Sequence, residues 1–259
     1  MKGLDGKVAL LVGGGEGAGR SIALGLAARG VRIVVTGPDE RALGETVGEI
    51  AYGGGKARHL AGDVRDAAHL DAAALRAIEV FGSLDFVIAN VEVHDRVDLG
   101  GYRARAETIL STNLVGTYNA FDAAARHVKG PGRVIATSSV LEPAGATGHG
   151  AFRASRAGIV GLVQAAAVEL APRKVTCNAV LPGWVDSDAS ERRFGQIAAA
   201  HGQKTKDELK TEAAATSPLG RFVQPEEVAD VVLFLCSSAG EAITGQTLAI
   251  GARAPLTVG

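Results

Sequence analysis

A glycine-rich turn near the N-terminus carries the clearest chemical signal in the sequence. Residues 13–19 read GGGEGAG and stand between an apolar run and a segment of helical periodicity. Glycines permit a tight turn and let the backbone approach a ligand, while the following helix presents unpaired N–H groups and the positive end of its dipole. Between the first strand and first helix of an α/β chain, such a turn predicts a site for a dinucleotide pyrophosphate.

The elements that would position this turn are short apolar runs alternating with helical segments, and several runs are nearly continuous, as in parallel strands covered on both faces. This alternation predicts one α/β domain over residues 1–259, with a doubly wound parallel sheet of Rossmann type. The predicted strands are Val8–Val12, Val31–Val35, Ala57–Ala61, Leu84–Ala89, Val134–Thr137, Val175–Val180 and Leu248–Ile250. The predicted helices are Ala18–Ala28, Glu40–Ile50, Ala67–Phe81, Ala104–His127, Ala151–Leu170 and Pro225–Leu235.

One long polar, alanine-rich segment interrupts the alternation at residues 186–216. It contains two short predicted helices, Glu191–Ala200 and Lys206–Ala215. An insertion after the carboxyl end of a strand is where a substrate lid would lie. We therefore predict a helical lid, and a surface helix pair without a role in function is the alternative.

The composition excludes several classes of function. The chain has 259 residues, a net charge of −1 and no cluster of basic residues, so nucleic acid is not an expected partner. Its apolar runs are too short for a membrane span, and the N-terminus lacks the apolar core of a signal peptide. Cys177 and Cys236 are predicted to be buried free thiols, which favours a cytoplasmic protein. No residues show metal-ligand spacing, so no metal is expected.

The glycine-rich turn resembles the signature of the short-chain dehydrogenase/reductase family, Thr-Gly-x-x-x-Gly-x-Gly. Gly13, Gly17 and Gly19 match its glycines, and Val12 replaces its threonine. The resemblance extends over nearly the whole chain. Its other matching segments are residues 62–64, 112–116, 178–183, 218–221 and 225–229.

This resemblance implies an oxidoreductase that uses NAD or NADP on a small alcohol or carbonyl substrate. Asp39 follows the second predicted strand, and a contact with the adenosine ribose would favour NAD, but its main expected role is to cap the helix that follows. The implied cofactor-binding residues are Gly13, Gly17, Ala18, Gly19, Asp63, Val64, Asn90, Arg156, Pro182, Gly183, Val185 and Ser187.

The resemblance also places a catalytic set at Asn113, Ser139, Phe152 and Arg156. The family uses a tyrosine and a lysine four residues apart on one helix face, together with a serine and an asparagine. Phe152 stands at the tyrosine position and cannot transfer a proton, a loss that typically costs about 10²–10⁴-fold in rate. Arg156 stands at the lysine position and keeps the charge, but its pKa above about 12 prevents proton relay.

Three functions are compatible with these departures. The first is a redox enzyme whose proton path is rerouted through another group. The second is a non-redox enzyme in which Arg156 and Ser139 stabilise an oxyanion. The third is a nucleotide-binding protein without turnover. We expect the first, because the glycine-rich turn, Asp63, Asn113, Ser139 and Ser187 are all kept. The candidate substitute proton donors are Glu92, His94, Glu142, His149 and Asp186.

Two predicted helices, Ala104–His127 and Ala151–Leu170, carry apolar residues on more than one face. Such breadth predicts burial against another subunit as well as against the sheet. We therefore expect a homo-oligomer, a dimer or a tetramer, and the resemblance implies the same. A thicker monomer core is the alternative.

Overall fold

The computed structural model describes residues 1–139, 147–202 and 204–251. Over these residues the chain forms a parallel sheet in the order β3-β2-β1-β4-β5-β6-β7. The strands are β1 Val8–Val12, β2 Arg32–Gly37, β3 Ala57–Ala61, β4 Phe86–Ala89, β5 Gly132–Thr137, β6 Val175–Pro182 and β7 Thr247–Ile250. The order reverses beside β1, where a crevice opens at the carboxyl ends of the strands.

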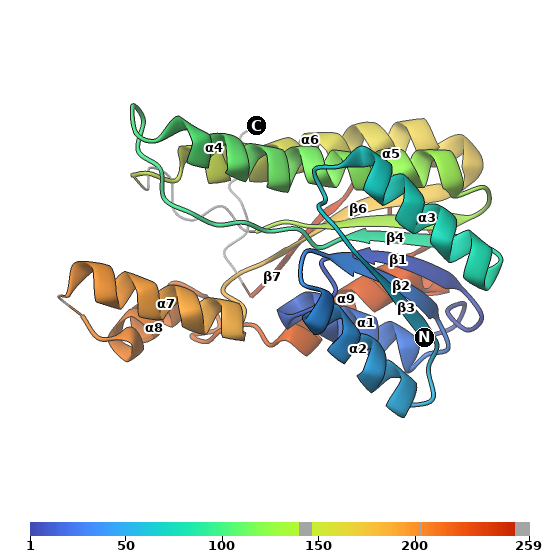
Figure 1. The fold of residues 1–259 in the computed structure, drawn as a ribbon, viewed down its shortest axis with the longest axis horizontal. Coiled ribbons are helices and arrows are strands. Elements are labelled where there is room, and N and C mark those ends of the chain that lie inside the picture. Colours follow the sequence, from blue (N-terminus) through green and yellow to red (C-terminus); the bar gives the residue numbers. More distant parts are fainter. Residues whose placement is uncertain (140–146, 203, 252–259) are drawn as a thin grey trace.

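Helices cover both faces of the sheet (Figure 1). One face carries α3, α4, α5 and α6, and the other carries α1, α2 and α9. This arrangement confirms the predicted single-domain, doubly wound fold. The helix bounds are α1 Gly17–Ala27, α2 Glu40–Tyr52, α3 Ala67–Phe81, α4 Arg103–Leu110, α5 Gly116–His127, α6 Gly150–Leu170, α7 Asp188–His201, α8 Lys206–Ala215 and α9 Pro225–Cys236.

Continuous apolar strands produce a core on each face of the sheet. Along β1, Leu10 and its alternate neighbours pack with α3, α5 and α6, while Ala9 and Leu11 pack with α1 and α9. Side chains alternate between faces along a strand, so a strand covered on both sides must be apolar throughout. These cores fix the strand ends from which the candidate site is built.

The segment predicted as one helix, Ala104–His127, is divided in the structure. A π-helical segment, η1 Ser111–Val115, separates α4 from α5. Asn113 lies in this segment, and its side chain bonds the backbone of Val93. Because that contact joins residues far apart in sequence, helical periodicity alone does not reveal the interruption.

The predicted helix pair of residues 186–216 is present as α7 and α8, which extend beyond the carboxyl ends of the strands (Figure 1). α7 begins earlier than predicted, because Ser187 and Ser190 form a capping box at its start. Phe194 and Phe222 pack with Trp184 beneath the pair. Its role as a substrate lid stays a prediction.

The helix α6 continues into the 3₁₀ turn η2 Ala171–Arg173. Together, residues Gly150–Arg173 form the one described helix long and apolar enough to cross a membrane by length and composition. One face of α6, including Ile159 and Val163, is buried against the sheet, and Phe152 near its start lines the cleft described below. The same helix therefore contributes both to the core and to the site.

Candidate functional site

A cleft of about 2120 Å³ opens at the carboxyl ends of the strands and runs from the glycine-rich turn to the helices α7 and α8. Most of the predicted site residues line it: Gly13, Gly17, Ala18, Asp63, Val64, Asn90, Ser139, Phe152, Pro182, Gly183, Val185 and Ser187. Gly19, Asn113 and Arg156 are buried and stand behind this lining. The structure thus brings the predicted residues together, while their roles stay predictions.

The glycine-rich turn has no room for side chains at two of its glycines. Gly13 has φ +82°, and a Cβ there would lie 1.9 Å from the carbonyl oxygen of Asn90. A Cβ on Gly19 would lie 1.8 Å from the carbonyl oxygen of Gly13. Glu16, the N-cap of α1, makes no side-chain cap, so the first N–H groups of α1 keep no side-chain partner there. This bare helix start fits an anionic group such as a pyrophosphate.

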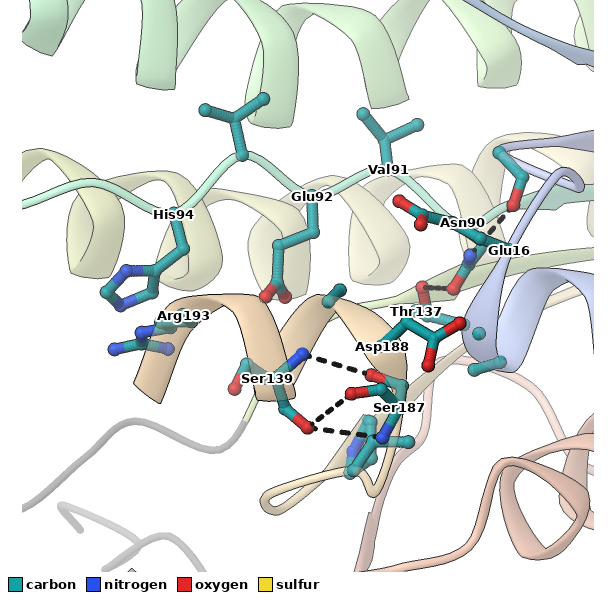
Figure 2. A pocket seen from close by; sticks show the side chains of 18 of the residues that line it. Glu16, Asn90, Val91, Glu92, His94, Thr137, Ser139, Ser187, Asp188 and Arg193 are labelled. Carbon is teal, nitrogen blue, oxygen red and sulfur yellow. Dashed lines mark hydrogen bonds between the residues drawn. The ribbon is translucent and has the colours of Figure 1, made fainter. Parts of the chain in front are cut away.

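Asn90 holds the glycine-rich turn against two strand ends (Figure 2). Its Nδ2 donates to the carbonyl of Gly13 at 3.0 Å, and its Oδ1 accepts from Thr137 Oγ1 at 2.7 Å. The ends of β1, β4 and β5 are thereby joined by one side chain. Asn90 therefore positions the turn from within the cleft lining.

The end of the cleft beside β2 and β3 contains both negatively and positively charged side chains. Asp39 caps α2 by accepting from the N–H of Ala42 at 3.0 Å, so the expected capping role is the one observed. Asp63 pairs with Arg65, whose side-chain hydrogen bond lowers the pKa of that carboxyl. Arg20 and Arg41 also line this end. No single charge there selects between NAD and NADP.

At the other end of the cleft, a buried guanidinium lies behind Phe152. Arg156 is 1% exposed, and its guanidinium carbon is 4.8 Å from the centre of the Phe152 ring. Its Nη1 donates to the carbonyl of Val91 at 3.1 Å, while Nε and Nη2 have no hydrogen-bond partner in the described structure. Burial lowers the pKa of Arg156, and the charge of Glu92 acts in the opposite direction.

Glu92 faces this guanidinium from the cleft side. Its carboxylate Oε2 is 3.5 Å from Arg156 Nη2, and its side chain is 48% exposed. Figure 2 shows Glu92 projecting into the cleft between Asn90 and His94. A carboxylate thus lines the cleft beside the buried guanidinium.

His94 also lines the cleft, with its ring centre 4.1 Å from that of Phe152 and 5.1 Å from that of His149. Burial, followed by the charges of Arg193, His149 and Arg156, lowers the pKa of His94 to about 3. His94 is therefore neutral at pH 7. Two further predicted proton donors, His149 and Asp186, are not part of this lining. Glu142 lies outside the described residues.

Asn113 supports the loop that carries Glu92. Its Oδ1 accepts from the N–H of Val93 at 2.7 Å, and its Nδ2 donates to the carbonyl of Val93 at 2.8 Å. Its own carbonyl accepts from Thr117 Oγ1 at 2.6 Å. Asn113 therefore holds the backbone of Val93 in place, and its catalytic role stays a prediction.

None of the three tyrosines brings a phenolic hydroxyl to the cleft in place of Phe152. Tyr52, Tyr102 and Tyr118 are all exposed, and none of them contributes to the described lining of the cleft.

The described residues contain no group of three or more His, Cys, Asp or Glu side chains that could hold a metal ion.

One contact of the cleft escaped sequence reasoning. Arg192 of α7 reaches Glu16 of the glycine-rich turn, with 2.6 Å between Nη2 and Oε2. The two residues are 176 positions apart. Spacing carries no signal for such a pair, because only the folded chain brings α7 to the glycine-rich turn.

A glycine-rich turn at the switch point of a doubly wound parallel sheet defines the dinucleotide-binding class of α/β proteins. A family model described as enoyl-(acyl carrier protein) reductase matches residues 13–252. The chain belongs to the short-chain dehydrogenase/reductase family of oxidoreductases.

Similar proteins are reductases and dehydrogenases. The 3-oxoacyl-[acyl-carrier-protein] reductase FabG of Staphylococcus aureus is 33% identical over 246 residues, covering 93% of this chain and 95% of that protein. The short-chain reductase protein NovJ of Streptomyces niveus is 33% identical over 255 residues, covering 96% and 94%.

Solved structures agree over almost the whole chain. A dehydrogenase/reductase from Sinorhizobium meliloti has a TM-score of 0.85 at 29% identity, covering 96% of each chain. A short-chain dehydrogenase from Burkholderia cenocepacia in complex with NADP has a TM-score of 0.85 at 29% identity, covering 96% of this chain and 98% of that one.

Proposed function

We propose that the protein is an NAD(P)-dependent oxidoreductase acting on a small alcohol or carbonyl, with Phe152 and Arg156 at the family's tyrosine and lysine positions. The observation that carries this proposal is the single cleft that joins the glycine-rich turn to Ser139, Glu92 and His94. Structures of two similar proteins contain NADPH and NADP, respectively, which favours NADP(H). Asp39 offers no opposing argument, because its carboxylate caps α2.

The residues present fit such a cofactor, since the turn leaves no space for side chains and ends at a bare helix start. A bound nicotinamide would supply the group that accepts or donates hydride. The first turn of α1 would hold the pyrophosphate, and Asn90 would keep the turn in place. Ser139, at the end of β5, would hydrogen-bond the substrate oxygen. The lid α7–α8 would exclude water from this end of the cleft.

The proton route is assigned to Glu92. Of the candidate donors described above, Glu92 and His94 line the cleft, and neutral His94 is suited to donating a hydrogen bond rather than to proton uptake at pH 7. In alcohol oxidation, the Glu92 carboxylate would accept the hydroxyl proton, while a bound nicotinamide would supply the hydride acceptor. In carbonyl reduction, Glu92 would return the proton to the substrate oxygen. Because Glu92 is half exposed, it exchanges that proton with water.

A paired substitution tests the assignment. Glu92→Gln keeps the size of the side chain and removes the carboxylate, whereas Glu212→Gln changes another cleft-lining carboxylate, one paired with Lys204. With a panel of alcohols and ketones, Glu92→Gln should lower kcat by about 10²–10⁴-fold. Glu212→Gln should leave kcat unchanged. An unaltered kcat in Glu92→Gln would remove Glu92 from the proton route.

The second candidate is a nucleotide-binding protein without turnover. It is favoured by one observation: Phe152, rather than a hydroxyl-bearing ring, lines the inner end of the cleft. Calorimetric titration with NADH and NADPH, followed by the substrate panel, separates the two. Binding without turnover supports the second candidate, and absence of binding removes both. The non-redox alternative loses support, because Arg156 stands behind the lining and stacks on Phe152.

We also propose a cytoplasmic homo-oligomer, a dimer or a tetramer, with a small-molecule substrate and no nucleic-acid or membrane partner. Val115, Tyr118 and Val168 are exposed on the outer side of η1, α5 and α6, where a second copy would cover them. Both cysteines are free, and burial raises the pKa of each to about 12, consistent with unreactive thiols. Light scattering after size exclusion tests the assembly, and cell fractionation tests the location.

A further inference from the structure

The start of α7 is anchored directly on the glycine-rich turn. Arg192 Nη2 lies 2.6 Å from Glu16 Oε2, and both residues line the cleft. Ser187, the N-cap of α7, stands beside Gly17, where an added Cβ would come within 3.6 Å of the Ser187 Cβ. The lid therefore meets the chain at the residues that shape the proposed phosphate site.

Glu16 places a negative charge at the start of α1. Its carboxylate stands at the start of α1 without capping it, so it leaves the helix N–H groups to a ligand and adds negative charge beside them. A pyrophosphate at the same helix start would be repelled by this carboxylate. Arg192 is the cation placed to offset that repulsion, and the hydrogen bond to Glu16 raises the pKa of Arg192.

Several other cations of residues 186–216 and of the cleft lining form ion pairs within their own region of the chain, unlike Arg192. The lid lysines pair within residues 186–216: Lys204 with Glu212, and Lys206 and Lys210 with Glu191. On the opposite wall, Arg20 pairs with Glu49 and Arg41 pairs with Glu45. Arg192 instead joins the lid to the glycine-rich turn across the cleft.

We propose that Arg192 is a pyrophosphate-binding residue, which exchanges Glu16 for the phosphate oxygens and so closes the lid over the dinucleotide. This inference rests on the dinucleotide site proposed above. A guanidinium presents parallel N–H groups that match two phosphate oxygens, and its bonds to phosphate are charge-assisted. The pair with Glu16 is exposed, at 57% and 62% for the two side chains, and exposed pairs are weak. Breaking the pair with Glu16 therefore costs little free energy.

The exchange predicts effects of opposite sign for the two partners. Arg192→Ala should weaken binding of ADP-ribose and of NADPH or NADH by roughly tenfold, the loss of one charged hydrogen-bonding group. Most of the change should lie in the dissociation rate, because the residue closes the cleft. Glu16→Gln should tighten binding by a few fold, since a competitor and a repelling charge are removed. Adenosine, which lacks the pyrophosphate, should bind Arg192→Ala and the unaltered protein equally.

Calorimetry with ADP-ribose and adenosine, and stopped-flow fluorescence with NADPH, give readouts that do not depend on turnover. Arg76→Ala is the matched control, because Arg76 forms a comparable exposed pair with Glu79 on α3, away from the cleft. Arg192→Lys should retain part of the affinity. Unchanged thermal unfolding temperatures would show that the variants remain folded.

The possible failures are distinguishable. If the unaltered protein binds neither ADP-ribose nor a nicotinamide dinucleotide, the proposed function itself is wrong, and this inference falls with it. If it binds them and Arg192→Ala binds equally well, only the role of Arg192 is wrong. If Glu16→Gln and Arg192→Ala weaken binding equally, the ion pair has a structural role and Arg192 does not exchange Glu16 for phosphate. That result also overturns the proposal.

Discussion

The guanidinium of Arg156 stacks on the ring of Phe152, with its central carbon 4.8 Å from the ring centre. The two residues are four positions apart on α6, so they share one face of that helix. The aromatic ring lines the cleft, and the cation lies behind it with two of its nitrogens lacking hydrogen-bond partners in the described structure. Phe152 thus presents to the cleft a ring without a hydroxyl.

Restoring the family's pair at these positions should raise the rate. We expect Phe152→Tyr combined with Arg156→Lys to increase kcat/KM for carbonyl reduction by about 10²–10⁴-fold, the contribution of a positioned general acid. In this double variant the further change Glu92→Gln should have little effect, because the proton no longer depends on Glu92. Initial rates with NADPH and NADH measure both outcomes. An unchanged rate in a folded double variant would contradict the proposed alignment of Phe152 and Arg156.

The depressed pKa of His94 predicts how stability depends on pH. Its value in the folded protein is about 3, against 6.5 ordinarily, so the unfolded chain binds the proton at higher pH than the folded one. The free energy of unfolding should therefore fall as the pH is lowered from about 6.5 toward 3. His94→Phe should lose less stability than the unaltered protein over this range, and His59→Phe serves as the control. Urea unfolding at a series of pH values measures the difference, and equal losses in all three proteins would refute it.

The strand–helix alternation and the glycine-rich turn were predictable, because both depend on local composition. The short apolar run Val8–Val12 is typical of a buried strand, and the glycines that follow it predict a tight turn. The crowding of Gly13 against Asn90 is visible only in the structure. The role of Asp39 was open in the sequence, since cap and ribose contact require the same position. The structure shows the cap.

What the sequence could not predict depends on distant contacts. The π-helical interruption at Ser111–Val115 holds Asn113 on the backbone of Val93. The pair of Arg192 with Glu16 joins α7 to the glycine-rich turn, two segments that lie far apart in the sequence. Likewise, a position in a motif does not tell whether a side chain lines a cleft, and Arg156 proved to be behind the lining.

Two buried asparagines should separate turnover from cofactor binding. Asn113→Ala leaves the N–H and carbonyl of Val93 without their partners beside Glu92, so kcat should fall more than affinity for the dinucleotide. Asn119→Ala removes the donor to the carbonyls of Val64 and Arg65, so dinucleotide binding should weaken instead.

Both asparagine variants should lose about 1–3 kcal/mol of stability, the cost of buried groups left unpaired. Urea unfolding, calorimetric binding and steady-state rates distinguish them. A parallel loss of kcat and affinity in the two variants would show that Asn113 acts only through general stability.

Close packing at the glycine-rich turn gives the sharpest stability contrast. Gly13→Ala places a Cβ 1.9 Å from the carbonyl oxygen of Asn90 and forces a left-handed backbone on alanine, so the turn must move. We expect this variant to lose dinucleotide binding and part of its stability. Gly44→Ala is the matched control: Gly44 lies within α2, with nothing within 4 Å of an added Cβ.

Because alanine has a higher helix propensity than glycine, Gly44→Ala should raise the free energy of unfolding by about 0.5–1 kcal/mol. Its binding of the dinucleotide should be unchanged. Calorimetry with ADP-ribose and thermal unfolding of the two variants measure the contrast. If Gly13→Ala bound the ligand as well as Gly44→Ala does, the turn would tolerate displacement from Asn90. The tie between the ends of β1, β4 and β5 would then be dispensable for the site.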